Sequence, residues 1–483
     1  MKYLLTFTST VLLLMGGGPF TSVLASNKSQ LQASENASSS ADQHSPAPPN
    51  IVMIISDDQR WTDYSFMGHE AIQTPALDQL AARSATFRRG YVPVALCRPS
   101  LATMITGLYP FQHKITGNDP ARTKDMSNAQ YNQLRSQLIA NIDAVPTLPK
   151  LLAEKGYVSF QSGKWWEGSF SRGGFTQGMS RGFPEQGGRH GDDGLKIGRN
   201  GMQPVLEFID SATESQKPFF LWYAPFLPHT PHNPPDRLLK KYAKPGRPVQ
   251  LAKYYAMCHW FDETCGTLID HLDKTGLAEN TLIVYVTDNG WIQRTSQSRV
   301  PDGWKSVFAP RSKQSPYDGG TRTPILISWP KKMKAQEYPD LVSSIDLIPT
   351  MLQAAGAEVP ANLPGVSLLP LTVDGTALQR DTIFGESYAH DVADLDDVEA
   401  SLLYRWVISG HWKLLLAYDG KTTRYGSVHD RTNFVPALYN LQDDPFEKEN
   451  VAKQQPAVVE ALKQKLDNWY RVKSRQVIDR SSK

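Results

Sequence analysis

The 483-residue chain has few of the features that mark membrane, nucleic-acid-binding or disulfide-stabilised proteins. It contains only three cysteines, and 51 Lys and Arg against 48 Asp and Glu leave a formal net charge of +3. So small a net charge gives no argument for a nucleic-acid or membrane partner. Beyond the N-terminus there is no apolar run of the about 18 residues that a membrane-spanning helix needs. The composition, 40% hydrophobic and 20% charged, is that of a globular protein with one large domain and a smaller one.

Residues 1–25 have the pattern of a secretory signal. Lys2 provides the positive start, residues 4–15 the apolar stretch and residues 23–25 the small-residue cleavage site. The alternative is an anchor that stays attached. Residues 26–49, rich in Ser, Asn, Gln and Ala, are predicted to be a disordered linker. We therefore expect an exported protein, periplasmic or extracellular, with no membrane span after signal cleavage.

The three cysteines are not expected to form a disulfide. Cys258 and Cys265 lie seven residues apart in a predicted helix, which separates their Cα atoms by about 10 Å. A disulfide requires less than about 7 Å. Both are expected to be small core residues, which leaves Cys97 as the cysteine with a function.

Strands and helices alternate over most of the chain. Continuous apolar runs predict buried strands at residues 50–56, 157–162, 219–223, 282–287 and 325–328. Helices are predicted between them, at residues 74–82, 147–155, 250–275 and 346–355. This alternation indicates an α/β fold with a large parallel or mixed central sheet flanked by helices.

From about residue 380 the pattern changes. Short strands at residues 382–387, 405–409 and 412–417 precede a helix predicted over residues 456–475. They predict a smaller antiparallel sheet with one helix. We therefore expect a catalytic domain over residues 50–379 and an α+β subdomain over residues 380–483.

Polar residues follow the predicted strands directly, where open α/β sheets bind their ligands. They are Asp57, Asp58, Lys164, His229, Asp288 and Asn289. The carboxylates and the carboxamide form an oxygen-only set that suits Ca²⁺ or Mg²⁺. Taken alone, the first aspartate pair is better explained as a strand-end turn or a helix cap. The second polar pair, at another strand end, makes a metal site the preferred interpretation.

Cys97 begins the segment Cys97-Arg98-Pro99-Ser100-Leu101, which leads into a helix ending at Gly107. A residue at a helix N-terminus faces free N–H groups and the positive end of the helix dipole, which favours bound oxyanions. The alternative is a buried structural cysteine.

These segments together resemble the active site of the type I, formylglycine-dependent sulfatases of the alkaline phosphatase-like superfamily. The similarity runs from about residue 50 to 451 and includes further family segments, at residues 163–168, 228–232, 313–322, 438–441 and 444–447. The resemblance implies an alkaline phosphatase-like fold and a sulfuric ester hydrolase. It also implies that a maturase converts Cys97 to formylglycine, whose hydrated aldehyde is the nucleophile.

The resemblance implies a role for each site residue. Ca²⁺, in preference to Mg²⁺, would be held by Asp57, Asp58, Asp288 and Asn289, while Lys164 and Lys313 would bind sulfate oxygens. His229, with a pKa near its usual value of about 6.5, would protonate the departing alcohol. His232 would either line the substrate side or face solvent. Arg98 is expected near the substrate and Arg322 in a structural ion pair.

The chain departs from the family pattern at two positions. Leu101 stands where the family has arginine, which affects recognition by the maturase, and Trp166 stands where the family has histidine. Arg98 could partly replace the missing positive charge.

The leading interpretation is an exported sulfatase acting on sulfated polysaccharides or their fragments. The alternatives are a phosphonate or phosphodiester hydrolase of the same fold, and a catalytically impaired protein that binds sulfated glycans. A long loop, residues 168–201, carries several basic residues and is either a solvated insertion or a basic wall that contacts anionic sugars. Its basic residues are Arg172, Arg181, Arg189, Lys196 and Arg199.

Overall fold

The computed structural model describes residues 47–292, 309, 311–422, 424–426, 429 and 431–480. Residues 48–483 form one compact unit. The predicted signal segment and most of the predicted linker lie outside the described residues. Within the described part of the chain, every helix is too short or too polar to cross a membrane.

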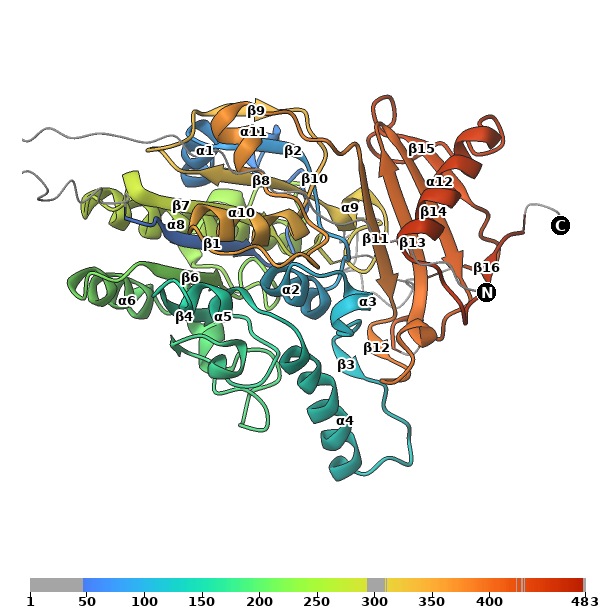
Figure 1. Cartoon of the computed structure of the whole chain (residues 1–483), viewed down its shortest axis with the longest axis horizontal. Helices are drawn as coiled ribbons and strands as arrows, with labels where there is room; N and C mark the ends of the chain where they lie inside the picture. Colours follow the sequence, from blue (N-terminus) through green and yellow to red (C-terminus); the bar gives the residue numbers. More distant parts are fainter. Residues whose placement is uncertain are drawn as a thin grey trace, which may run out of the picture. The chain divides into compact units, whose positions relative to one another are not determined.

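A nine-stranded mixed sheet is the centre of this unit (Figure 1). Four parallel strands form its middle, in the order β7 (Thr281–Thr287), β1 (Asn50–Ser56), β6 (Phe219–Ala224) and β4 (Val158–Gly163). Short β5 (Gln177–Gly178) continues one side, and β8 (Arg322–Ser328) joins β7 antiparallel on the other. Beyond β8 come β2 (Ala85–Tyr91), β9 (Gln336–Tyr338) and β10 (Val342–Ser343). The predicted mixed α/β sheet is confirmed.

Helices cover both faces of the large sheet. Because successive side chains of a strand point to opposite faces, the alternate residues of β1 enter two separate apolar cores. Ile51, Met53 and Ile55 belong to the core that includes α2 (Cys97–Thr106), α5 (Leu148–Ala153) and α10 (Leu347–Ala354). Val52 and Ile54 belong to the core that includes α1 (Pro75–Ala82), α6 (Gln203–Glu214) and α8 (Val249–Lys274). Burial on both faces explains why the strand sequence is continuously apolar.

A second, five-stranded antiparallel sheet follows in the chain, as predicted. It contains β11 (Thr382–Tyr388), β13 (Leu402–Ser409), β14 (Trp412–Tyr418), β15 (Ala437–Asn440) and β16 (Val477–Ile478). Helix α12 (Pro456–Trp469) packs against it. Both sheets lie in the same compact unit, and the predicted division at residue 380 stays a prediction.

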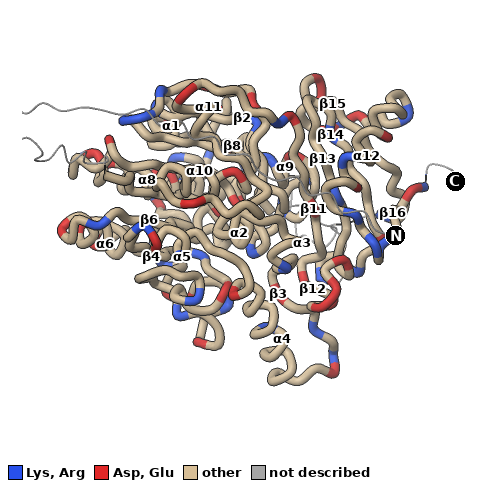
Figure 2. Tube along the Cα trace, viewed as in Figure 1, with Lys and Arg blue, Asp and Glu red and all other residues tan. Residues whose placement is uncertain are grey.

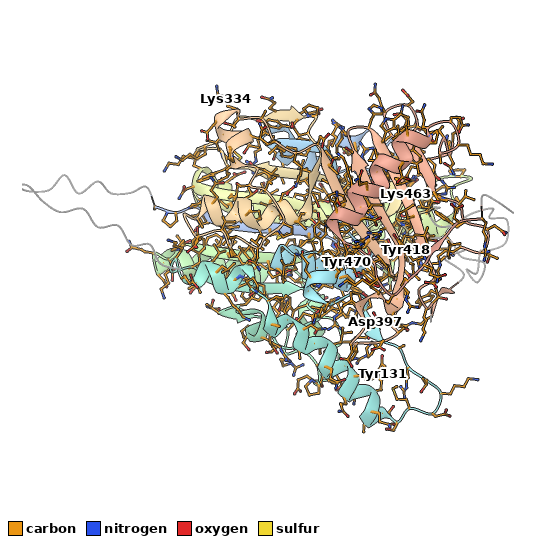
Figure 3. All side chains as sticks on the ribbon, turned by 45° about the vertical axis from the view of Figure 1, so that its right-hand side comes forward. Tyr131, Lys334, Asp397, Tyr418, Lys463 and Tyr470 are labelled. Atoms are coloured by element: carbon orange, nitrogen blue, oxygen red, sulfur yellow. The ribbon has the colours of Figure 1, made fainter. Side chains whose placement is uncertain are left out.

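Helix α12 ends six residues before the predicted end at residue 475. Arg405 of β13 donates a hydrogen bond to the carbonyl of Leu466 (3.0 Å) and another to the carbonyl of Tyr470. Its Nε also donates to the hydroxyl of Tyr418 (2.7 Å); Figure 3 labels both tyrosines. A guanidinium that takes up the last helical carbonyls favours the end of the helix at that turn.

The remaining elements are short connections. They are α3 (Pro110–His113), β3 (Asp119–Pro120), α4 (Asn128–Ala140), α7 (Asp236–Tyr242), α9 (Asp318–Thr321), α11 (Leu369–Asp374) and β12 (Asp391–Val392), with 3₁₀ helices η1 (Ser65–Met67), η2 (Asn141–Ala144), η3 (Phe170–Gly173), η4 (Asp192–Lys196), η5 (Ala278–Asn280), η6 (Ser344–Asp346) and η7 (Val398–Ser401). Strands β3 and β12 pair in parallel, which joins the segment after α3 to the segment after β11. The loop of residues 168–201 contains three of these short elements, η3, β5 and η4.

Candidate active site

The carboxyl ends of the parallel strands bring the predicted polar residues together. Asp57 and Asp58 follow β1, Asp288 and Asn289 follow β7, and Lys164 follows β4. The backbone N–H of Asp288 donates to the carbonyl of Ser56 (2.9 Å), and that of Asp58 donates to Asp288 Oδ1 (3.0 Å). Asp58 has a left-handed φ of 63°, which aspartate tolerates better than most residues. The ends of β1 and β7 are thus fixed to each other.

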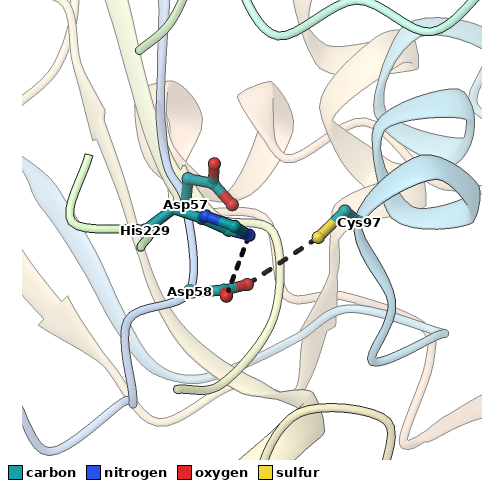
Figure 4. A group of neighbouring side chains, drawn as sticks. All are labelled: Asp57, Asp58, Cys97 and His229. Atoms are coloured by element: carbon teal, nitrogen blue, oxygen red, sulfur yellow. Dashed lines mark hydrogen bonds and ion pairs between the residues drawn. The ribbon is translucent and has the colours of Figure 1, made fainter. Parts of the chain in front are cut away.

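Cys97 is the first residue of α2 and is buried (Figure 4). Its Sγ lies 3.7 Å from Asp58 Oδ1 and 3.7 Å from Asn289 Oδ1. Burial raises the pKa of the thiol to about 12, although Lys164 and Lys313 oppose this. A neutral thiol is a poor nucleophile, so the unmodified side chain is not suited to attack an ester.

The two predicted lysines both contact the aspartates. Lys164 Nζ lies 2.7 Å from Asp57 Oδ1, and Lys313 Nζ lies 2.6 Å from both carboxylate oxygens of Asp58. Burial raises the pKa of Asp57. Burial acts in the same direction on Asp58, but Lys313, His229 and Lys164 together outweigh it and lower the pKa of that carboxyl. Two ammonium groups are therefore held at the strand ends by carboxylates.

The oxygen donors fit a hard divalent cation. Asp57 Oδ2 and Asp288 Oδ2 are buried and make no hydrogen bond within the described residues. A buried carboxylate oxygen without a partner is unfavourable, and a cation would satisfy both atoms. The Asn289 amide donates to Asp58 Oδ1 (2.7 Å) and Asp288 Oδ1 (2.8 Å), so all four predicted ligands form one cluster. Carboxylate and amide oxygens are the ligands that Ca²⁺ and Mg²⁺ prefer.

His229 faces the same cluster. Its Nδ1 lies 2.6 Å from the carbonyl oxygen of Thr230, a geometry in which Nδ1–H donates. Nε2 then lies 3.4 Å from Asp58 Oδ2 and 3.5 Å from Lys313 Nζ. The expectation of an ordinary pKa is wrong, because burial lowers the pKa of His229 well below 6.5 and Asp58 only partly opposes it. The protonated imidazole is consequently a stronger acid than a free histidine.

His232 packs between aromatic side chains. Its ring packs near Tyr254, at 5.6 Å between centroids, and near Trp291, at 6.4 Å. It is half-buried, and its Nε2 makes no hydrogen bond within the described residues. The structure thus disagrees with a fully solvent-facing loop histidine, and contact with a substrate stays a prediction.

Arg98 is placed differently from the expectation. Its Nε and Nη2 lie 2.8 and 2.7 Å from the two carboxylate oxygens of Glu167, and Nη1 donates to the carbonyl of Asn118 (3.2 Å). The side chains of Arg98 and Glu167 are only 2% and 3% exposed. A guanidinium bound in this way by a protein carboxylate is not available to a substrate or to the position of the missing arginine. Arg98 instead ties the start of α2 to the loop after β4.

Glu167 and Asn118 are site residues that the sequence analysis did not identify. Asn118 Oδ1 also accepts the backbone N–H of Arg98 (3.0 Å), so it supports the residue next to Cys97. Glu167 lies inside the family segment around Lys164. A carboxylate in that segment could have suggested an ion pair with Arg98. Asn118 offered no such signal.

The other predicted basic residues are mostly paired. Arg322 lies 3.6 Å from Asp318, the structural ion pair that was expected. In the loop of residues 168–201, all five basic residues contact protein groups: Arg172 binds Asp143, Arg181 and Lys196 bind Asp193, Arg189 binds Asp119, and Arg199 donates to the carbonyls of Phe226 and His229. Arg189 alone of the five has its guanidinium carbon over the ring of Trp166, at 4.6 Å.

The two departures from the family pattern lie in the same apolar core. Leu101 and Trp166 are both buried and share this core with Cys97. The Trp166 ring also packs against His190, at 5.1 Å between centroids. Leucine and tryptophan therefore fill space by packing where the family has two polar side chains.

Leu101→Arg is expected to lower stability although it restores the family motif. The longer side chain enters a packed core, which costs about 1–3 kcal/mol, and Glu167 is already bound to Arg98. The expected result is a lower melting temperature with more aldehyde at residue 97, as measured by thermal unfolding and peptide mass. Leu101→Met is the volume-matched control and should change stability by less than about 1.5 kcal/mol. An arginine variant as stable as the wild type would contradict the packing argument.

The comparisons with known proteins cover nearly all of the described chain. The sulfatase family model matches residues 49–357, and that of the N-sulphoglucosamine sulphohydrolase C-terminal region matches residues 311–472. Arylsulfatase A of Homo sapiens is 29% identical over 468 residues, which cover 86% of this chain and 87% of that protein. N-acetylgalactosamine-6-sulfatase of Canis lupus familiaris is 27% identical over 453 residues, covering 83% and 81%.

Among solved structures, the chain is similar to Ps i-CgsB in complex with k-i-k-neocarrahexaose. The identity is 25%, the TM-score is 0.64, and the match covers 87% of this chain and 92% of that one. The alkaline phosphatase-like fold expected from the sequence is confirmed by these neighbours.

Proposed function

The chain belongs to the sulfatase family and is a sulfuric ester hydrolase, and from that premise we propose an exported enzyme that cleaves sulfate esters of polysaccharides or their fragments. The observation that carries the proposal is the position of Cys97 Sγ, 3.7 Å from Asp58 and from Asn289. In the proposal Cys97 is converted to formylglycine, and a divalent cation, Ca²⁺ in preference to Mg²⁺, is held by Asp57, Asp58, Asp288 and Asn289.

Formylglycine and the divalent cation would contribute differently to the reaction. Formylglycine supplies a hydrated aldehyde oxygen as the nucleophile, which a neutral thiol of raised pKa could not replace. When bound by the four residues named above, the cation would supply positive charge that stabilises the sulfate group.

Lys164 and Lys313 are proposed to bind the nonbridging oxygens of the sulfate. Each ammonium has three N–H donors, and the aspartates occupy only part of them. Residue 97 begins a ten-residue helix, and the positive end of the helix dipole also favours an oxyanion there. Preorganised positive charge around a group that gains charge in the transition state lowers the barrier.

His229 is proposed to protonate the leaving alcohol. Its Nδ1 faces the carbonyl of Thr230, which fixes the ring and leaves Nε2 for the transferable proton. Phe226 stacks on the imidazole at 4.3 Å between centroids and holds the same orientation. A fixed ring with a lowered pKa gives up its proton readily once protonated.

Sulfated carbohydrates are proposed as substrates because relatives named for such activity cover most of the chain. One is N-acetylgalactosamine-6-sulfatase, and one structural neighbour was solved with a bound oligosaccharide. The signal-like residues 1–25 support export to the periplasm or the extracellular space, and a formylglycine-generating maturase is the implied partner.

The mass of the peptide containing residue 97 tests the nucleophile directly. Replacing a thiol by an aldehyde removes sulfur and two hydrogens and adds oxygen, which lowers the mass by about 18 Da. The peptides containing Cys258 and Cys265, both buried thiols, are internal controls and should not change. A panel of sulfated sugars, aryl sulfates and phosphodiesters then tests the reaction. Active, natively produced protein with only unmodified Cys97 would overturn the formylglycine proposal, and phosphodiester turnover above sulfate-ester turnover would overturn the substrate class.

His229→Ala is expected to slow sulfated sugars far more than aryl sulfates. A sugar alcohol is a poor leaving group and needs the proton, and general acid catalysis contributes typically 10²–10⁴-fold. An aryl sulfate releases an acidic phenol that needs little protonation. The measurement is kcat on both substrates, with His271→Ala as the control, because His271 of α8 pairs with Asp210 and is not a candidate site residue. Equal losses on both substrates would remove His229 from the acid role.

A further inference from the structure

Three arginines converge on one buried carboxylate beside the candidate active site. Arg135 of α4, Arg189 of the loop of residues 168–201 and Arg424 of the C-terminal region all contact Asp119 in β3. Arg135 Nη2 lies 3.1 Å from Oδ1, Arg189 Nε 3.1 Å from both oxygens, and Arg424 Nη2 3.3 Å from Oδ2. These arginines come from three segments that are distant in the sequence. Figure 3 shows α4, with Tyr131 labelled one turn before Arg135.

The cluster carries more positive than negative charge. Asp391 is its second carboxylate and lies 3.0 Å from Arg424 Nη2, so three guanidinium groups face two carboxylates. His390 Nδ1 also lies between Asp391 Oδ1 (2.5 Å) and Arg424 Nη2 (3.1 Å). Asp119, His390 and Asp391 have the residue types of a metal site, but three guanidinium groups repel a cation. The excess charge favours an anion.

The guanidinium groups keep donors that the two carboxylates do not use. Each guanidinium has five N–H groups in a planar fork that matches carboxylate, sulfate and phosphate oxygens. Within the described residues, Nη1 of Arg135, Arg189 and Arg424 makes no hydrogen bond. The side chains of Arg189 and Arg424 are 36% and 46% exposed, so a ligand can reach them. Asp119 thus positions arginines that still have free donors.

The cluster is connected to the reacting position by short contacts. Arg189 lies over Trp166, and the next residue, Glu167, binds Arg98 beside Cys97. On the other side Asn118, next to Asp119, accepts the backbone N–H of Arg98. Figure 2 shows Lys and Arg interspersed with Asp and Glu along the coloured part of the trace. The three arginines are linked to residue 97 through these contacts.

We propose that Arg135, Arg189 and Arg424 form a subsite for a second anionic group on the sugar chain that carries the scissile sulfate. This inference rests on the proposed function. The second group is a carboxylate or another sulfate, both of which offer paired oxygens to a guanidinium fork. A sulfated polysaccharide with regularly spaced anionic groups is the corresponding substrate class.

The test compares oligosaccharides that carry the same scissile sulfate and differ in the neighbouring sugar. That neighbour is neutral, carries a carboxylate, or carries a second sulfate. The measured quantity is kcat/KM on each anionic-neighbour substrate divided by kcat/KM on the neutral-neighbour substrate. Arg189→Gln and Arg424→Gln are each expected to lower this ratio about tenfold, the effect of one lost hydrogen bond to a charged group. The loss should lie mainly in KM, and the substrate whose ratio falls identifies the carboxylate or the sulfate.

Arg172→Gln is the matched control. It lies in the same loop, its side chain is 35% exposed against 36% for Arg189, and it pairs with Asp143 away from the cluster. The control should leave the ratio unchanged. A wild-type protein that does not prefer either anionic neighbour, or glutamine variants that keep the wild-type ratio, would overturn the subsite while the sulfatase proposal stands. A wild-type protein that hydrolyses none of the sulfate esters would overturn the proposed function instead.

Discussion

Asp57→Ala and Asp288→Asn are both expected to abolish turnover, but with opposite effects on stability without added metal. Asp57 pairs with buried Lys164 at 2.7 Å, so its removal leaves a buried ammonium without its carboxylate and costs about 3–5 kcal/mol. Asp288 has no lysine within ion-pair distance among the described residues. Burial raises its pKa, and the nearby Asp58 adds to that effect. Asp288→Asn removes the cost of burying this charge, so the variant should be at least as stable as the wild type.

Added Ca²⁺ separates the metal role from the ion pairs. A ligand that binds the folded state at 100 times its Kd stabilises it by about 2.7 kcal/mol, and both variants should lose this gain. The measurement is thermal unfolding with and without Ca²⁺, together with turnover. Asp262→Ala is the control, because this buried carboxylate accepts the N–H groups of Ala76 and Leu77 at the start of α1, away from the site. It should lose stability and keep the Ca²⁺ response. An Asp288→Asn variant that kept the full Ca²⁺ response would contradict the metal assignment.

The grouping of the polar residues at the strand ends could be predicted from the sequence. An apolar run such as residues 50–56 is a strand buried on both faces, and parallel strands end at one edge of the sheet. Polar residues directly after such runs therefore meet, and Asp57, Asp58, Asp288 and Asn289 do so. The sequence also indicated α2 behind Cys97, since Gly107 ends it in the left-handed conformation.

What could not be predicted depends on contacts between residues distant in the chain. Arg98 binds Glu167, which is 69 residues away in the sequence. No local sequence pattern shows whether an arginine binds such a distant carboxylate or a substrate. The earlier end of helix α12 is favoured by Arg405 of strand β13, which donates to the last helical carbonyls. The lowered pKa of His229 follows from burial, which a motif does not reveal. In each case the deciding quantity is the side-chain environment, and only tertiary packing sets it.

Arg98→Met and Glu167→Met are each expected to destabilise the protein by about 3–5 kcal/mol. Either change leaves one charge of a buried, bidentate pair without its partner. The double variant should recover much of this loss, because a buried ion pair replaced by apolar side chains of similar volume is often neutral. The measurement is a double-mutant cycle by denaturant unfolding. Arg237→Met removes an exposed arginine that pairs with Glu263, and as a control it should change stability by less than about 1 kcal/mol.

Activity in the double variant decides whether the pair only stabilises the fold or also positions residue 97. Arg98 is covalently next to Cys97, and its guanidinium fixes the first turn of α2 to Glu167 and Asn118. If this contact sets the position of the nucleophile, the recovered double variant should still have a reduced kcat at unchanged aldehyde content, because misplacing a reacting group by about 1 Å can reduce the rate about 100-fold. If both stability and kcat recover, the pair is purely structural. A double variant no more stable than the single variants would contradict the ion-pair argument itself. In that case the packing around α2, and not the paired charges, would hold the start of the helix.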